Sequence, residues 1–173
     1  TPGARQGKPR PWLGIRTRGV GGRVRVTHVL DDGPAQLAGL CADDEIIALG
    51  DDYAGKTGTM MSPRHFEQFI LPGLRTIVSD IKARGASCIK HTDGNIWGIL
   101  DLLVSTGVDA LGPLEGPYMK LDEVRRRHRV GVVGNVDVDL LSRGSVEQVV
   151  AATREQLARV SPLGGHLLGS GNS

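Results

Sequence analysis

Aromatic side chains are scarce in this chain, since Phe, Trp and Tyr make up 3% of its 173 residues. Aliphatic side chains must therefore fill the core that a hydrophobic content of 39% allows. The scarcity also argues against a nucleic-acid surface, which would interleave aromatic and basic residues. Neither sign of charge dominates, because 21 basic and 19 acidic residues leave a net charge of +2. No strong overall field attracts nucleic acid or a membrane.

Cysteine and long hydrophobic runs are also rare. Cys41 and Cys88 stand far apart and without C-x-x-C spacing, so a disulfide framework is not expected and a reducing, cytoplasmic setting fits better. No apolar run is long enough to span a membrane, and no signal peptide is visible. The basic run from Arg125 to Arg129 reads as the solvated last turn of a helix. We therefore predict a cytoplasmic protein without nucleic-acid or membrane partners.

Glycine is abundant instead, with 25 residues, about twice the usual ~7%. This abundance favours chance matches to glycine-based motifs. One match is GDDYAGKT at 50–57, which fits the phosphate-loop pattern G-x-x-x-x-G-K-[ST]. A phosphate loop needs a helix that starts at Lys56 and Thr57, so that its amides face the phosphates. Gly58 follows instead and the next helix start is at Pro63, so we do not expect nucleotide binding.

The pattern of predicted elements changes at Gly50. Residues 1–11 read as a disordered lead-in, and residues 12–50 read as short strands around one turn and a short helix at 34–40. Strands and helices alternate after Gly50, which predicts parallel βα units. The predicted elements are helix 62–85, kinked or divided by Pro72, strand 87–91, helix 96–106, strand 108–111, helix 121–128, strand 130–136, helix 145–160 and strand 165–170.

Three stretches before the change carry one resemblance: PWLGI at 11–15, RVTHVLDDGPAQLAGL at 25–40 and DDEIIALG at 43–50. They resemble a bacterial PDZ domain over about 40 residues, less than half of such a module. The second helix of that family, which forms one wall of its peptide groove, has no counterpart here. The resemblance implies a truncated, β-rich cap over residues 12–50.

Five later stretches carry a second resemblance: DDYAGKTGTMMSPRHFEQFILP, IKHTDGNIWGILDLL, GVDALGPLE, VGNVDVDLL and GGHLLGSGNS. Residues 51–173 are similar to the C-terminal half of the uroporphyrinogen decarboxylase superfamily, which includes the cobamide-dependent methyltransferases. The resemblance implies half of a (β/α)8 barrel. We therefore predict an α/β half-barrel with an N-terminal β-rich cap derived from a PDZ segment. Both resemblances break at Gly50, which suggests a non-homologous fusion.

The sequence departs from both branches of this superfamily. The decarboxylases carry a His on the last strand in an N-L-G-H-G motif, where this chain reads LGSGN at 168–172, and their first half supplies further essential residues. The methyltransferases bind zinc through a His-x-Cys motif and a last-strand Cys. This chain has His91 and Asp93 at the first place and Ser170 or Gly171 near the second.

Polar residues are expected at the carboxyl ends of four predicted strands, where parallel βα folds gather their functional groups. His91 and Asp93, with Asp137 or Glu115, would make an open three-ligand site for zinc or another divalent metal. We predict Asp137, Lys56 and Asp52 as the catalytic groups. The structural alternatives are that His91 and Asp93 bond the backbone at the barrel rim, and that Lys56 pairs with a neighbouring aspartate.

The leading hypothesis is a metal-assisted hydrolase of activated esters or phosphoesters, because an open metal site lowers the pKa of bound water to about 7. Residual decarboxylase-like or cobamide methyltransferase-like activity, or tetrapyrrole binding, is one alternative. A non-catalytic fusion or a peptide-binding module is another. The predicted partners are a small-molecule substrate and a second copy of the chain, since half a barrel leaves open sheet edges.

Overall fold

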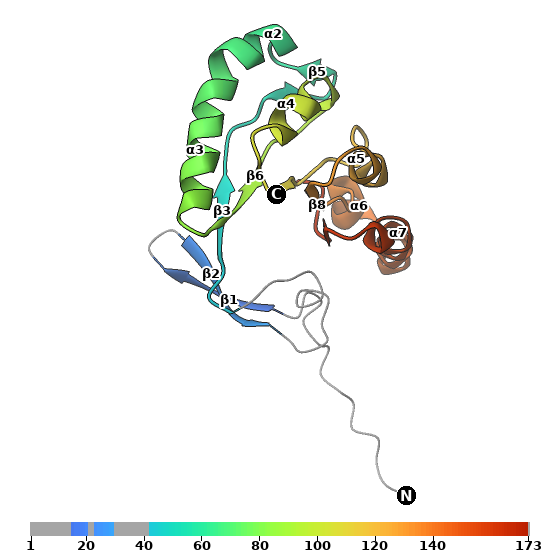
Figure 1. Ribbon diagram of the computed structural model, residues 1–173. Helices are drawn as coiled ribbons and strands as arrows, with labels where there is room; N and C mark the ends of the chain where they lie inside the picture. The colour runs from blue at the N-terminus through green and yellow to red at the C-terminus, as the bar shows by residue number, and fades with distance from the viewer. Residues whose placement is uncertain (1–14, 21–22, 30–41, 173) are drawn as a thin grey trace, which may run out of the picture. The chain divides into compact units, whose positions relative to one another are not determined.

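The computed structural model describes residues 15–20, 23–29 and 42–172, which divide into two units, 1–45 and 46–173. In the first unit, β1 (Ile15–Val20) and β2 (Arg23–Val29) form an antiparallel hairpin (Figure 1). Val26 is buried, and its backbone bonds to Asp43 and Asp44. The predicted lead-in at 1–11 and the predicted helix at 34–40 lie outside the described residues.

The second unit is built on five parallel strands in the order β3–β6–β7–β8–β9 (Figure 1). Leu49 lies opposite Lys90, and Lys90 lies opposite Leu111, so the first three strands end level with one another. The strands are β3 (Glu45–Leu49), β6 (Ser87–Lys90), β7 (Ala110–Leu111), β8 (Gly131–Val133) and β9 (His166–Leu167). This sheet confirms the predicted α/β class and is consistent with part of a (β/α)8 barrel.

Helices connect and cover these strands. Figure 1 shows α3 running alongside β3 and β6, where Leu74, Val78 and Ile81 join Cys88 in the core. The helical elements are α2 (Pro63–His65), the π-helical turn η1 (Phe66–Ile70), α3 (Leu71–Ala83), the 3-10 turn η2 (Trp97–Ile99), α4 (Leu100–Val104), α5 (Leu121–Arg127), α6 (Val138–Arg143), α7 (Val146–Val160) and the 3-10 turn η3 (Ser161–Leu163). Among the described residues, no helix is both long and apolar enough to cross a membrane.

Local signals placed two helices correctly. Ser62 caps α2 by accepting a hydrogen bond from the backbone N of His65, and Pro72 falls in the first turn of α3, directly after the π-helical turn. The helical run therefore continues through Pro72, with a π-helical turn directly before it, where the sequence predicted a kink or a division. Ser145 caps α7 and exchanges hydrogen bonds with Gln148 in a capping box, as the predicted helix 145–160 requires.

Strand lengths were predicted less well. The predicted strand 130–136 is too long, because β8 ends at Val133 and Gly134 takes a φ of 117°, which only glycine adopts readily. The predicted last strand, 165–170, is reduced to two residues and one further bridge between Val136 and Ser170. Helix α6 was not predicted at all.

The segment GDDYAGKT folds as a small hairpin. Strands β4 (Ala54–Gly55) and β5 (Gly58–Thr59) pair antiparallel, and Lys56 is exposed in the turn between them. The next helix begins at Pro63, as the sequence predicted. The amides at Lys56 therefore lie in a turn rather than at a helix N-terminus, and the match to the phosphate-loop pattern lacks the structure that makes such a loop bind phosphate.

Candidate metal centre

Three ionisable side chains gather where two neighbouring strands end. Asp52 follows β3, while His91 and Asp93 follow β6, which pairs with β3 in parallel. Parallel neighbours end at the same edge of a sheet, so these residues are brought together across about 40 positions of sequence. One ligand atom from each side chain lies within 4.8 Å of the other two.

The spacing of these atoms suits a small divalent cation. The Nε2 atom of His91 lies 3.6 Å from Oδ1 of Asp52 and 3.7 Å from Oδ1 of Asp93. Two ligands at a tetrahedral angle, each about 2.1 Å from zinc, would lie about 3.4 Å apart. Three protein ligands of this kind leave a fourth position for water or substrate, which is the arrangement of catalytic zinc sites.

Asp93 has the environment of a ligand that needs a cation. Its Oδ1 atom is buried and accepts no hydrogen bond from the described residues. Burial raises the pKa of the Asp93 carboxyl, and the negative charge of Asp52 raises it further. His91 and a hydrogen bond from the Asn172 side chain act in the opposite direction. A metal ion would supply the positive charge that the buried oxygen lacks.

Backbone contacts fix the loop that carries these ligands. The backbone N of Asp93 donates to Oδ1 of Asp52 over 3.0 Å, and the backbone N of Gly94 donates to Oε2 of Glu115 over 2.7 Å. Gly94 has a φ of 76°, and a Cβ atom there would lie 2.6 Å from the carbonyl oxygen of Gly55. The close packing explains why glycine stands at this position.

Lys90 holds the same strand ends from inside the protein. Its side chain is fully buried, and its Nζ donates to the backbone carbonyl oxygens of Gly50, Asp51 and His91. Asp51 directly precedes the candidate ligand Asp52, and His91 is itself a candidate ligand. Lys90 therefore ties together the two segments that carry the metal group.

An aromatic ring also borders Lys90. Its Nζ lies 4.4 Å from the centre of the Tyr53 ring, a distance at which a cation and an aromatic face attract each other. Burial lowers the pKa of Lys90 to about 8, although the charges of Asp51 and Asp52 act to raise it. The side chain is thus largely protonated at neutral pH and keeps three hydrogens for three carbonyl oxygens.

The family model for uroporphyrinogen decarboxylase (URO-D) matches residues 37–173, which is more than half of the chain. The chain belongs to the URO-D family. No curated protein and no solved structure matches it. The URO-D match begins upstream of Gly50 and includes β3, which the sequence analysis had attributed to a PDZ-like segment. The comparisons give no evidence of a PDZ segment, and Gly50 is not where the URO-D similarity begins.

The URO-D region brings together only some of the predicted site residues. His91 and Asp93 meet as predicted, and Asp52, predicted as a catalytic group, lies at ligand distance from them. Glu115 accepts a hydrogen bond from the backbone N of Gly94 and does not belong to the three-residue group. Lys56 points from the exposed hairpin turn and does not belong to this three-residue group.

Asp137 has a structural place in the URO-D region, outside the three-residue group. Its Oδ1 accepts a hydrogen bond from the backbone N of Leu140 over 2.9 Å and so caps α6. An aspartate at a strand end and an aspartate at a helix start look alike in a sequence when the helix follows within a residue or two. Helix α6, which the sequence pattern did not predict, gives Asp137 this capping role.

Replacement of Asp137 by alanine should separate these two roles. We expect the variant to lose about 1 kcal/mol of unfolding free energy, the usual effect of removing an N-cap. Metal binding should stay within about twofold of the unaltered chain. Urea unfolding and a metal titration measure the two quantities. A loss of metal binding without a change in stability would return Asp137 to the site.

Two residues that contribute to this centre were missed. Asn172, which bonds Asp93, is a polar residue just beyond the last parallel strand, so its place in the order of elements was a usable signal. Lys90 lies two residues after Cys88, and alternation along a strand puts both on one face. Cys88 lies in the core, and Lys90 is fully buried on the same face.

Proposed function

We propose that this URO-D family chain binds one divalent metal ion, such as zinc, through Asp52, His91 and Asp93, and acts there on a small-molecule substrate. The observation that carries the proposal is the buried Oδ1 atom of Asp93, which accepts no hydrogen bond from the described residues and lies 3.7 Å from Nε2 of His91. A carboxylate oxygen in that state is destabilised unless a cation is near.

The remaining residues of the centre would orient the ligands. Asn172 bonds Asp93, Glu115 holds the backbone of the ligand loop, and Lys90 holds the ends of β3 and β6. When bound, the metal would supply a Lewis acid with an open position, which lowers the pKa of a bound water or substrate group. Groups of this supporting kind affect metal affinity by tenfold or more when they are removed.

Membership in the URO-D family favours chemistry of the family's kind at this centre. Decarboxylase-like or cobamide methyltransferase-like activity, or binding of a tetrapyrrole, thus ranks above hydrolysis of activated esters or phosphoesters. Hydrolysis is supported only by the open position of the metal group. A change in the absorbance spectrum of an added porphyrin or corrinoid would support a function of the family's kind, whereas turnover of a chromogenic ester would support hydrolysis. A small-molecule substrate and association of two chains stay predictions.

Metal content before and after loss of His91 tests the proposal directly. After incubation with zinc or manganese and dialysis, we expect about one ion per chain by elemental mass spectrometry. The His91→Ala variant should retain less than about a tenth of that amount, because one of three ligands is gone. His65→Ala is the matched control, since His65 is exposed on α2. Equal metal content in both variants would refute the site.

A further inference from the structure

A second cluster of charged side chains lines an open surface pocket of about 750 Å³. Its lining residues are Arg125, Arg126, Arg127, His128, Arg129 and Leu163. The volume falls in the usual range for ligand pockets, about 300–1,000 Å³. Its lining differs from that of most such pockets, which are mainly apolar. A cavity with four arginines and one histidine selects for negative charge in whatever occupies it.

The topology separates this basic pocket from the metal group. The basic residues come from the end of α5 and the segment that leads into β8, and Leu163 precedes β9. The metal group follows β3 and β6. All five strands are parallel, so residues that precede strands lie at the opposite edge of the sheet from residues that follow them. The basic pocket is therefore not a part of the metal centre.

One guanidinium of the pocket is held in place by the backbone. The Nη1 atom of Arg125 donates to the carbonyl oxygen of Val130 over 2.6 Å, and its Nη2 atom donates to that of Leu163 over 3.0 Å. These bonds leave further N–H groups of the same planar fork for a ligand. A cation fixed in this way loses little conformational entropy when an anion binds.

The other basic residues are neutralised only in part. Arg126 pairs with Asp122 over 2.8 Å, and Asp122 also pairs with Arg159 on α7. Arg129 is exposed and has no acidic partner among the described residues. A solvated helix end would explain cations in the last turn of α5, but the run continues past that turn to Arg129.

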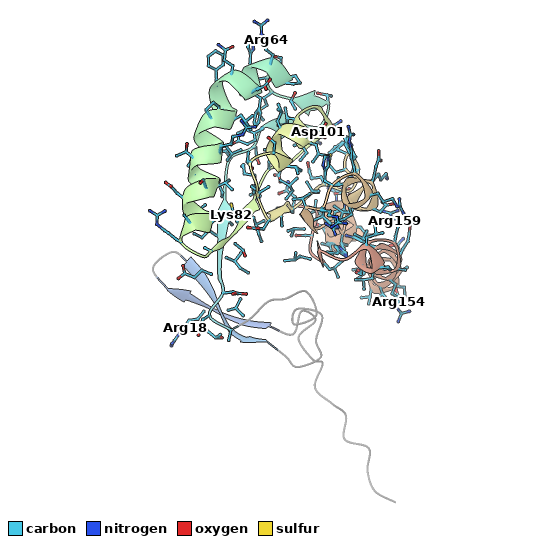
Figure 2. All side chains as sticks on the ribbon, in the orientation of Figure 1. Arg18, Arg64, Lys82, Asp101, Arg154 and Arg159 are labelled. Atoms are coloured by element: carbon cyan, nitrogen blue, oxygen red, sulfur yellow. The ribbon has the colours of Figure 1, made fainter. Side chains whose placement is uncertain are left out.

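A second carboxylate, Asp101, also limits the positive charge of the pocket. Asp101 of α4 lies 2.9 Å from Nε2 of His128 and 3.6 Å from Nη2 of Arg127. Figure 2 shows Asp101 on α4 and Arg159 on α7, the two helices on either side of α5. Asp101 is 66% exposed, so it competes with a bound anion for Arg127 and His128 from the solvent side.

We propose that this basic pocket binds a compact, phosphate-bearing small molecule. Guanidinium groups recognise phosphate oxygens with paired, charge-assisted hydrogen bonds, and several arginines in one cavity suit an anion of more than one charge. A nucleic acid fits less well, because no aromatic side chain lines the cavity and the whole chain carries a net charge of only +2.

Inorganic pyrophosphate is the probe that tests this proposal, with the full chain in low-salt buffer and calorimetry as the readout. We expect one site per chain, and at least about tenfold weaker binding in the double variant Arg127→Gln, Arg129→Gln. The matched control is Arg64→Gln, Arg154→Gln, which removes the same charge from two exposed positions that do not line the pocket; both are labelled in Figure 2. Its affinity should stay within about twofold.

A variant that gains affinity makes the test independent of damage to the fold. Asp101→Asn should bind pyrophosphate about threefold or more tightly, because Arg127 and His128 lose their competing carboxylate. If the double variant does not fold, Arg129→Gln alone takes its place. Absence of pyrophosphate binding, an equal loss in the control, or stronger binding of a short single-stranded oligonucleotide than of pyrophosphate would each overturn the proposal.

Discussion

An Asp93→Asn variant should lose the metal and yet unfold at a higher temperature when no metal is present. Burial and the charge of Asp52 raise the pKa of Asp93, so the ionised carboxylate is less stable in the folded chain than in the unfolded one. Asparagine keeps the shape without the charge. We expect the metal-free midpoint to rise by about 2–4 °C, the shift that about 1 kcal/mol gives in a chain of this size.

The direction of the Asp93 pKa shift determines how the stability gain of Asp93→Asn depends on pH. A carboxyl whose folded pKa is raised binds its proton more tightly in the folded state, so it lowers stability at neutral pH, where it is ionised. This cost shrinks as the pH falls below the raised pKa, and it is gone below the ordinary pKa of the unfolded chain, where Asp93 is neutral in both states. The gain in Asp93→Asn should therefore be present at pH 7 and vanish in acid.

The Asp93→Asn substitution should have an unfavourable effect on metal binding. A neutral amide in place of a ligand carboxylate should weaken zinc binding by about a hundredfold or more. Thermal melts in chelator and in excess zinc measure both effects. The matched control is Asp52→Asn, whose side chain is 46% exposed and accepts from the backbone of Asp93. It should also lose zinc but gain less stability than Asp93→Asn, because it removes only the smaller of the two causes that raise the Asp93 pKa. A lower midpoint for Asp93→Asn in chelator would show that the buried oxygen is not destabilising.

Helix boundaries were the part of the fold most open to prediction, because they depend on near neighbours. Ser145 and Gln148 form a capping box within four residues, and Pro72 acts on the turn that contains it. Strand ends were harder to predict. The end of β8 depends on Gly134, which packs against the backbone of Leu114 from another part of the chain. A continuous apolar run does not record where a buried strand stops.

The assignment of β3 shows a second limit of the sequence. EIIAL is a short apolar strand that would suit a PDZ-like sheet or a parallel βα sheet equally well. Its pairing with β6, in which Leu49 lies opposite Lys90, decides the matter and is a long-range property. The positions of His91 and Asp93 could be predicted because residues at the ends of parallel strands gather at one edge. Whether Asp52 or Asp137 lies beside His91 and Asp93 depends on which strands are neighbours in the sheet.

Replacement of Lys90 by methionine should be the most destabilising of the single changes considered. The variant keeps the apolar stem and removes the ammonium that donates hydrogen bonds to the carbonyl oxygens of Gly50, Asp51 and His91. Each buried carbonyl left without a donor costs about 1–3 kcal/mol of stability. Burying an ammonium also costs free energy, and the variant no longer bears that cost, which offsets part of the loss. We expect a net loss of about 2–4 kcal/mol in urea unfolding.

Metal affinity should fall together with stability, by about tenfold or more, since Lys90 holds the segments on which Asp52 and His91 lie. Lys56→Met is the control for the loss of one lysine charge. Lys56 is exposed in the β4–β5 turn, so its replacement should change stability by less than about 0.5 kcal/mol. A folded Lys90→Met protein that binds zinc like the unaltered chain would show that the ligands keep their places without the ammonium.

The pH dependence of this stability difference separates the buried ammonium from a simple packing effect. Burial lowers the pKa of Lys90 to about 8 in the folded chain, whereas the unfolded chain holds the proton to a higher pH. Between these values the unfolded state binds more protons, so the stability of the unaltered chain rises with pH relative to that of Lys90→Met. The difference between the two proteins should therefore grow above pH 8. A difference that stays constant from pH 7 to pH 10 would contradict a depressed pKa and leave packing as the explanation.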